Sequence, residues 1–172
     1  MVSTSSPEKL TLTLEIESLE ASVSNYFQSS NDALFSIHKN ALSELKYLRL
    51  PPAPIIEIIK AIAYLLGHKD NGDWESIRKY ISDTTCFLEK LAKLHEEFIM
   101  TDEIKELVYP IIYESGFNTQ SLMKYSIVIS KLYLWADNFL RYAEKKECLL
   151  RLKNHLSIII KSEECCYNEN QS

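Results

Sequence analysis

The stretch of sequence that decides the fold is ALSELKYLRLPPAPIIEIIKAIAYLLG, residues 41–67. Before its prolines, three leucines recur at the spacing of one helix face: Leu42, Leu45 and Leu48. This periodicity predicts an amphipathic helix. Pro51 and Pro52 are a helix break, because proline has no backbone N–H to donate and disfavours the helical conformation in the residue before it.

A buried central helix is predicted directly after the double proline, over residues 54–66. Pro54 suits its first turn, where the missing N–H would have had no partner in any case. The following apolar residues cover most of the helix circumference: Ile55, Ile56, Ile58, Ile59, Ile62, Leu65 and Leu66. A helix that is apolar nearly all round belongs in the middle of a domain, and Gly67 is its predicted C-cap.

The composition narrows the classes of protein that this chain can belong to. Its 172 residues include 46% hydrophobic residues but only 3 glycines, which favours helices over sheets with tight turns. A formal net charge of -5 argues against a general nucleic-acid binder. The longest apolar run, residues 53–67, is too short to span a membrane. We therefore expect no nucleic acid and no membrane among its partners.

Neither the start of the chain nor its cysteines suggest secretion. Residues 1–9 are polar and contain no apolar segment of the kind found in signal peptides. The cysteines follow no metal-ligand or disulfide-framework spacing: Cys86, Cys148, Cys165 and Cys166. A reducing, intracellular compartment is the expectation.

The two ends of the chain carry heptad spacing, which is typical of a helix that faces a partner helix. The first series is Leu12, Ile16, Leu19, Val23 and Tyr26, and the last is Leu149, Leu152, Leu156 and Ile159. We predict one helix or a near-continuous pair over residues 10–49, with a weak point at residues 29–32. A final helix is predicted from a cap at Asn118 or Thr119 to about Ser162, antiparallel to the first.

Short helices are predicted between these two ends. Asp73 and Thr101 precede apolar periodic segments and are candidate N-caps. Pro110 should kink or end the helix that follows Thr101. Trp74 and Trp135 lie on apolar helix faces and are interpreted as core anchors.

The predicted fold class is therefore all-α, a small globular bundle of about six helices on a two-stranded antiparallel coiled-coil stalk. The predicted division is a disordered start (1–9), a first stalk strand that runs into a tip helix (10–40), a globular tip (41–133), a second stalk strand (134–163) and a disordered tail (164–172).

No constellation of residues suggests catalysis or a cofactor. The sequence contains no Gly-rich phosphate loop and no nucleophile–base pairing. His68, His95 and His155 are far apart and flanked by charged residues, so they are interpreted as surface histidines and not as metal ligands. The acids around Glu96 and Glu103 fall on helix starts and exposed faces, where negative charge favours the helix dipole. We expect no catalytic, cofactor-binding or metal-binding residues in this segment, and hence no enzyme.

Several motifs, taken in order, resemble one known family. They are ALSELKYLRLPP, the helix ending LLG at Leu65–Gly67, DWESIRKYI from Asp73, FLEKL from Phe87, FN at Phe117 and LYLWADNFLRYA around Trp135. Over roughly residues 20–156 the chain resembles the microtubule-binding domain at the tip of the dynein heavy-chain stalk, with both coiled-coil strands cut short.

The resemblance implies a mechanical role and two partners. In this family the tip binds α/β-tubulin in microtubules, and an AAA+ ring in the rest of the heavy chain hydrolyses ATP. Sliding of one stalk helix past the other carries the signal between them. Composition and periodicity say nothing about tubulin, so this implication comes from the resemblance alone. It also implies that the sequence is an excerpt of a longer protein. The location that the resemblance implies is the cytoplasm and its cytoskeleton, with the cilium axoneme as a second candidate.

The family's basic tubulin-facing positions can be matched residue by residue. The first pair falls on His38 and Lys39, although the family usually has two cations there. The second falls on Asp83, a reversal of charge, with Arg78 and Lys79 one turn earlier. In the last helix the match is Lys124, and Gln120 replaces the acid often found one turn before it. Lys131 completes the candidate set. Fewer cations imply weaker attraction to acidic tubulin.

The family also tends to have a proline in each stalk strand where the strand meets the tip. The matching positions are Asn25 and Arg151, so both prolines are absent. Without them, the helices are expected to run straight through this stalk junction.

Two functions from different classes remain open. One is a microtubule-binding module, and the alternative is a structural helical adaptor that has kept the fold and lost strong tubulin binding. A basic face at the end distal to the stalk would favour the first: Lys39, Lys46, Arg78, Lys79, Lys124 and Lys131. Scattering of these residues among acids would favour the second. Self-association through the acidic ends is a third possibility, which sedimentation can test.

Overall fold

The computed structural model describes residues 7–69 and 72–169, with side chains described up to residue 164. In chain order the elements are α1 (Pro7–Phe35), α2 (Lys39–Leu45), α3 (Ala53–Leu65), α4 (Trp74–Ile77), α5 (Thr84–Glu97), α6 (Asp102–Tyr109), the π-helix η1 (Pro110–Glu114), α7 (Thr119–Met123) and α8 (Ile127–Glu169). The described residues contain no strand, which confirms the all-α class.

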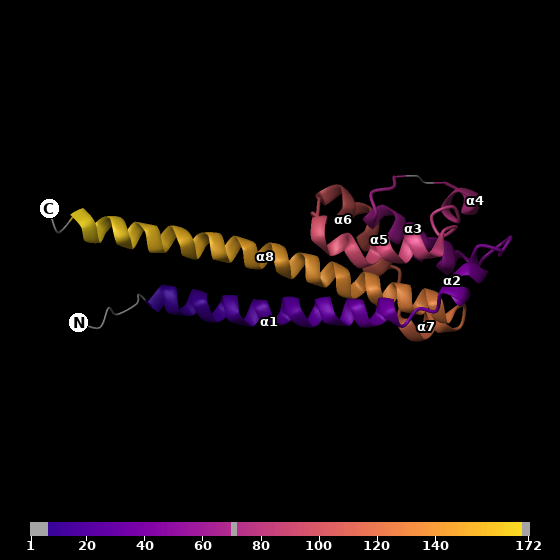
Figure 1. Ribbon diagram of the computed structural model, residues 1–172, viewed down its shortest axis with the longest axis horizontal. Coiled ribbons are helices and arrows are strands. Elements are labelled where there is room, and N and C mark those ends of the chain that lie inside the picture. The colour runs from indigo at the N-terminus through magenta and orange to yellow at the C-terminus, as the bar shows by residue number, and fades with distance from the viewer. Residues whose placement is uncertain (1–6, 70–71, 170–172) are drawn as a thin grey trace.

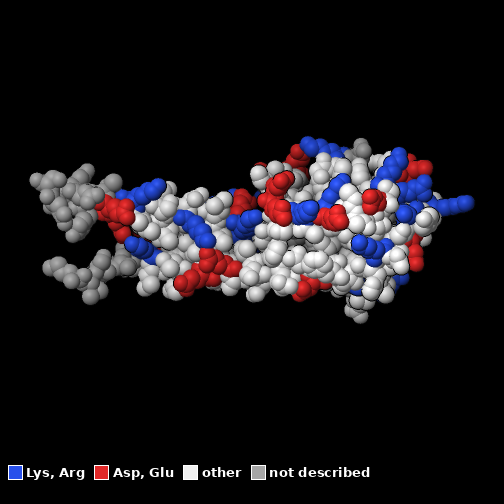
Figure 2. Space-filling view, viewed as in Figure 1, with Lys and Arg blue, Asp and Glu red and all other residues white. Residues whose placement is uncertain are grey.

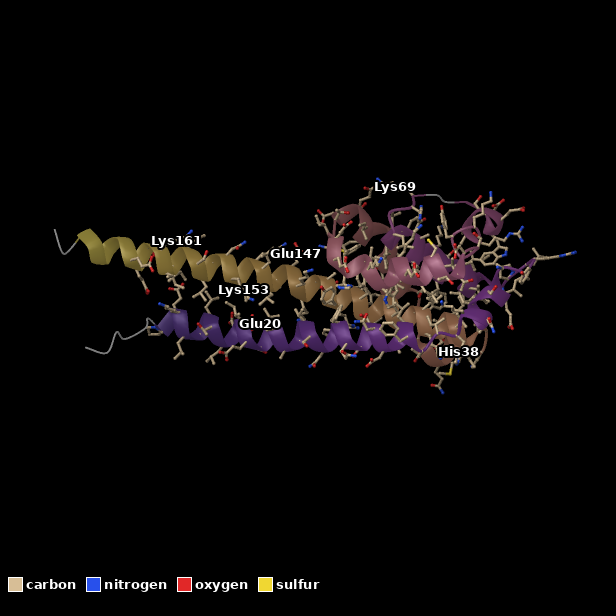
Figure 3. The ribbon with its side chains drawn as sticks, in the orientation of Figure 1. Glu20, His38, Lys69, Glu147, Lys153 and Lys161 are labelled. Carbon is tan, nitrogen blue, oxygen red and sulfur yellow. The ribbon has the colours of Figure 1, made fainter. Side chains whose placement is uncertain are left out.

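Helices α1 and α8 lie side by side and antiparallel, so that the start of α1 and the end of α8 are at one end of the molecule (Figure 1). The shorter helices form a knob at the other end (Figure 1). On the stalk, Lys9 pairs with Glu163 at 3.2 Å, and Lys153 pairs with Glu20 at 2.6 Å (Figure 3). Exposed pairs of this kind contribute about 0–1 kcal/mol each. The buried seam residues Leu12 and Ile16 are therefore the main source of the association energy here.

Helix α3 is the centre of the knob, as its apolar circumference predicts. Eight of its 13 residues are buried: Ile55, Ile58, Ile59, Ala61, Ile62, Ala63, Tyr64 and Leu65. They share one core with the first half of α8, where Trp135 stacks on Phe139 with ring centroids 5.1 Å apart. Trp135 is a core anchor, as predicted. Trp74 is also buried, and its indole N–H donates to the carbonyl of Leu48 at 2.7 Å.

The predicted helix ends are confirmed where a local motif defines them. Gly67 has φ +86°. Its N–H donates to the carbonyl of Tyr64, and the N–H of His68 donates to the carbonyl of Ala63. This pair of bonds is a Schellman motif, which needs a residue with positive φ at Gly67. The predicted N-caps accept bonds from the first turns of α4, α6 and α7: Asp73, Thr101 and Asn118.

The break in the first long helix was predicted at the wrong place. Residues 29–32 are helical, because Ser30 is buried with its hydroxyl bonded to the carbonyl of Phe27. The chain instead leaves the helix after Phe35, where Ser36 bonds back to Ala33 and Lys131 of α8 caps the Ser36 carbonyl. The next helix, α2, ends at Leu45, about one turn before the predicted end at residue 49.

The second long helix also differs from its prediction at both ends. It is interrupted between α7 and α8, although no proline or glycine lies there, because Ser126 acts as a new N-cap and accepts from the N–H of Ile129. At the other end, α8 continues to Glu169 instead of ending near Ser162. The tail predicted to be disordered is thus helical over 164–169, as is the start over 7–9; residues 1–6 and 170–172 lie outside the described part.

Candidate functional site

Three segments that carry the candidate basic residues lie at the end of the knob distal to the stalk. These are α2 with His38 before it, the residues after α4, and the stretch from the end of α7 into the first turns of α8 (Figure 1). His38 is labelled on this end in Figure 3. Figure 2 shows Lys and Arg side chains gathered there with a few acids among them. The fold therefore brings together candidate residues that are up to 93 positions apart in the chain, from His38 to Lys131.

The first segment presents one cation outright. His38 is the N-cap residue of α2, with extended backbone and a carbonyl that accepts from the N–H of Leu42 at 3.1 Å. Its exposed side chain makes no capping bond. Lys39 follows in the first turn and is exposed. This placement leaves both side chains available to a partner.

The second segment is partly neutralised by its own acids. Arg78 Nη2 lies 2.9 Å from Glu75 Oε1, whereas Lys79 is exposed. Asp83, at the position where the family has a cation, is the N-cap of α5 and accepts from the N–H of Cys86 at 2.9 Å. A carboxylate at an N-cap stabilises a helix by about 1 kcal/mol. The reversed charge thus has a structural role in this chain.

The third segment is free of acids. From Ser115 to Ala136 the sequence contains Lys124 and Lys131 but no Asp or Glu. Lys124 is exposed at the C-cap of α7, so its charge also complements the negative end of that helix. Lys131 is half-buried and donates to the carbonyl of Ser36. This bond ties α8 to the end of α1, a role that the sequence pattern did not indicate.

The stalk-junction positions lie on straight helices, as the missing prolines predict. Asn25 is inside α1 and Arg151 is inside α8, and both side chains are exposed. Arg151 pairs with Glu147 on its own helix. Neither residue interrupts the backbone hydrogen bonding of its helix, so α1 and α8 meet the knob without a kink of the proline type.

The histidines expected at the surface are in three different settings. His68 stacks on Tyr80 with ring centroids 4.2 Å apart. His95 was expected to be a plain surface residue, but it packs edge-on against Phe27 at 4.7 Å and so links α5 to α1. His155 is exposed on α8.

Within the described residues, no group of three or more His, Cys, Asp or Glu side chains could hold a metal ion. In the same residues, every helix is too short or too polar to cross a membrane.

A tyrosine cluster where the π-helix packs on α8 was not predicted. Tyr109 donates its hydroxyl hydrogen bond to Glu144, and Arg141 lies 5.7 Å from the ring centroid of Tyr113 while pairing with Asp137 at 3.0 Å. Burial, and then the hydrogen bond to Glu144, raise the pKa of Tyr109 above its ordinary value of 10.0. Burial and the negative charge of Glu144 raise the pKa of Tyr113 in the same direction.

These raised pKa values predict a loss of stability at alkaline pH. The folded chain keeps the tyrosine protons above pH 10, whereas the unfolded chain releases them, so the free energy of unfolding should fall as the pH rises beyond about 10. Tyr109→Phe removes one of these groups and should make that fall less steep. Urea unfolding followed by circular dichroism between pH 8 and 11 measures the slope. Tyr125→Phe, at an exposed tyrosine, is the control.

The fold and its surface define a helical knob on an antiparallel two-helix stalk, with charged and apolar side chains displayed at the far end of the knob. The chain matches no protein-family model. It is 28% identical over 116 residues to a cytoplasmic dynein heavy chain of Dictyostelium discoideum, which covers 67% of this chain. It is 25% identical over 132 residues, or 76% of the chain, to cytoplasmic dynein 2 heavy chain 1 of Caenorhabditis elegans.

A flagellar relative shows the same level of similarity. The chain is 27% identical over 113 residues, or 64% of its length, to the flagellar outer arm dynein beta chain of Chlamydomonas reinhardtii. The matched segment is only 2% to 3% of the length of these three relatives. The chain is thus related to a small segment of dynein heavy chains, both cytoplasmic and flagellar.

Proposed function

We propose that this chain is the microtubule-binding stalk tip of a dynein heavy chain. The observation that carries the proposal is the polarity of the molecule. The stalk strands leave the knob at one end, and α2, α4 and α7 lie at the other (Figure 1). The exposed residues Lys39, Lys79 and Lys124 are in or directly after these three elements. Such an arrangement suits a module that holds an acidic filament at its tip and is connected through its stalk to a distant motor. The similarity to dynein heavy chains supports the same function.

The stalk supports a mechanical coupling in this proposal. Its ion pairs, Lys9–Glu163 and Lys153–Glu20, are exposed and separated by about three helical turns of α1. Exposed pairs are weak, so their exchange for other partners costs little. The two helices can then slide past each other and carry a signal between the tip and an AAA+ ring in the rest of the heavy chain. The segment itself acts as a binding element and not as an enzyme.

The alternative function, a structural adaptor with the same fold, is favoured by three contacts. Arg78 is paired with Glu75, Lys131 is engaged by the Ser36 carbonyl, and Asp83 caps α5 where the family has a cation. The first contact neutralises a cation, the second holds an ammonium group against the protein's own backbone, and the third adds an acid to the distal surface. The tip proposal places the protein on the cytoskeleton, either in the cytoplasm or in the axoneme. The adaptor function does not require tubulin as a partner.

Co-sedimentation with taxol-stabilised microtubules across a salt series separates the two functions. The tip proposal expects pelleting at low salt that weakens as salt rises, because surface charges are screened. Absence of pelleting at low salt, from a protein that circular dichroism shows to be helical, would reject the tip proposal and favour the adaptor. Analytical ultracentrifugation of the free protein tests self-association at the same time.

A further inference from the structure

The connection between α2 and α3, residues 46–52, reaches further from the stalk than any other described segment (Figure 1). We call it the apex loop. The sequence pattern identified it only as a helix break at a double proline. Its side chains, however, are displayed at the end of the knob where the candidate basic residues gather (Figures 2 and 3).

The apex loop is held in one conformation by contacts at both ends. Trp74 donates its indole N–H to the carbonyl of Leu48 at 2.7 Å, and Lys46 Nζ donates to the carbonyl of Ser82 at 3.3 Å. On the other side, Pro51 and Pro52 have fixed φ angles. A loop that is already ordered loses little conformational entropy when it binds, which favours a role in recognition.

The loop exposes two large apolar side chains, and the ring of Tyr47 has the Lys46 ammonium 5.3 Å from its centroid. Leu50 is 95% exposed and Tyr47 is 74% exposed. A single exposed apolar residue needs no explanation, but the α7–α8 connection at the same end adds Met123, Tyr125 and Ile127, each more than half exposed. Two segments at the distal end of the knob, one of them the apex loop, thus expose apolar groups, which is typical of an interaction surface.

The charges around the loop indicate the kind of partner. Between His38 and Leu50 the cations Lys39, Lys46 and Arg49 accompany a single acid, Glu44. This segment is therefore positively charged, whereas the chain as a whole carries a net charge of -5. Positive charge around apolar side chains complements an acidic protein surface with an apolar depression.

We infer that the apex loop is a second recognition element for tubulin, in which Leu50 and Tyr47 bury apolar surface while the lysines of α2 and α7 provide the charge. This inference rests on the proposed microtubule-binding function. It implies that part of the affinity is insensitive to salt, because burial of apolar groups is not screened by ions. That part compensates for the cations that the chain lacks at His38 and Asp83.

The test is a microtubule co-sedimentation titration of Leu50→Ser at several salt concentrations. Burial of a leucine side chain is worth about tenfold in affinity, so the dissociation constant should rise by about that factor at every salt concentration, with an unchanged dependence on salt. Ile99→Ser is the matched control, because Ile99 is 77% exposed in the α5–α6 connection, at the end of the knob that faces the stalk. The affinity of Ile99→Ser for microtubules should equal that of the wild type.

The outcomes separate the two proposals. Wild-type binding with an unchanged affinity for Leu50→Ser would overturn the apex-loop inference and leave the microtubule-binding function standing. A wild-type protein that does not pellet at low salt would overturn both. A loss in Leu50→Ser that disappears at high salt would also overturn the inference, because it would indicate an indirect electrostatic effect. Circular dichroism should show equal helix content for all three proteins, since both substituted side chains are exposed.

Discussion

Reversing the charges of Lys39 and Lys124 together is expected to weaken microtubule binding by at least about 100-fold, and so to abolish pelleting at salt concentrations where the wild type pellets. Both side chains are exposed, and they come from separate elements, α2 and α7, that both lie at the distal end of the knob. Each reversal replaces an attraction to acidic tubulin with a repulsion. Because neither residue is buried, the fold should be unaffected.

The matched control for this variant is the double reversal Lys145→Glu, Lys161→Glu. Both residues are exposed on α8, and Lys161 is labelled far along the stalk in Figure 3. The two double variants carry the same net charge, so any effect of overall charge on association affects them equally. Equal weakening by both variants would contradict a localised binding surface. Weakening confined to the Lys39 and Lys124 variant would place that surface on α2 and α7.

The parts of the fold that could be predicted from the sequence are those defined by short-range patterns. The apolar circumference of α3, its stop at Gly67 and the N-caps at Asp73, Thr101 and Asn118 depend on residues within one or two turns. The heptads at the two ends likewise predict an antiparallel pair, because the chain between them forms one compact knob. Local signals of this kind carry their own physical cause, so no tertiary information was needed.

The parts that could not be predicted depend on contacts between distant residues. Helix α1 ends after Phe35 where Lys131 of α8 reaches the Ser36 carbonyl, and the serines at 29 and 30 do not interrupt it because Ser30 is buried against the rest of the fold. The same holds for Trp74, whose bond to the Leu48 carbonyl orders the apex loop from 26 residues away. Neither contact leaves a periodic trace in the sequence.

For the candidate site, the sequence indicated which residues carry charge but not which charges are available. Arg78 and Lys131 were placed in the same group as Lys39 and Lys124, yet the first is paired with Glu75 and the second caps a backbone carbonyl. Asp83 illustrates the same point in reverse, since a residue whose charge is opposite to the one expected there is the N-cap of α5. Whether a charged side chain is available depends on its contacts in the folded chain. Among the candidate lysines, Lys39, Lys79 and Lys124 are exposed.

Trp135→Ala is expected to lower the free energy of unfolding by about 3–5 kcal/mol, because removal of a buried large side chain costs both its transfer energy and the cavity left behind. Trp135 is 1% exposed and stacks on Phe139 in the core shared by α3 and α8. Urea unfolding followed by circular dichroism measures the change. Leu134→Ala, at the preceding position of α8 and 38% exposed, is the control and should cost far less.

The unfolding curve of Trp135→Ala also shows whether the knob and the stalk unfold together or separately. Domains are stable by about 5–15 kcal/mol, so a loss of 3–5 kcal/mol at one knob residue would remove a large share of the total. If Trp135→Ala unfolded the whole chain in one earlier transition, α8 would be shown to couple the knob to the stalk as one cooperative unit. A cost below about 1 kcal/mol would contradict the central place of this tryptophan in the core. Two separate transitions would mean that the stalk unfolds independently of the knob. Helix α8 would then couple the two parts only weakly, and it would be poorly suited to carry a signal from the tip along the stalk.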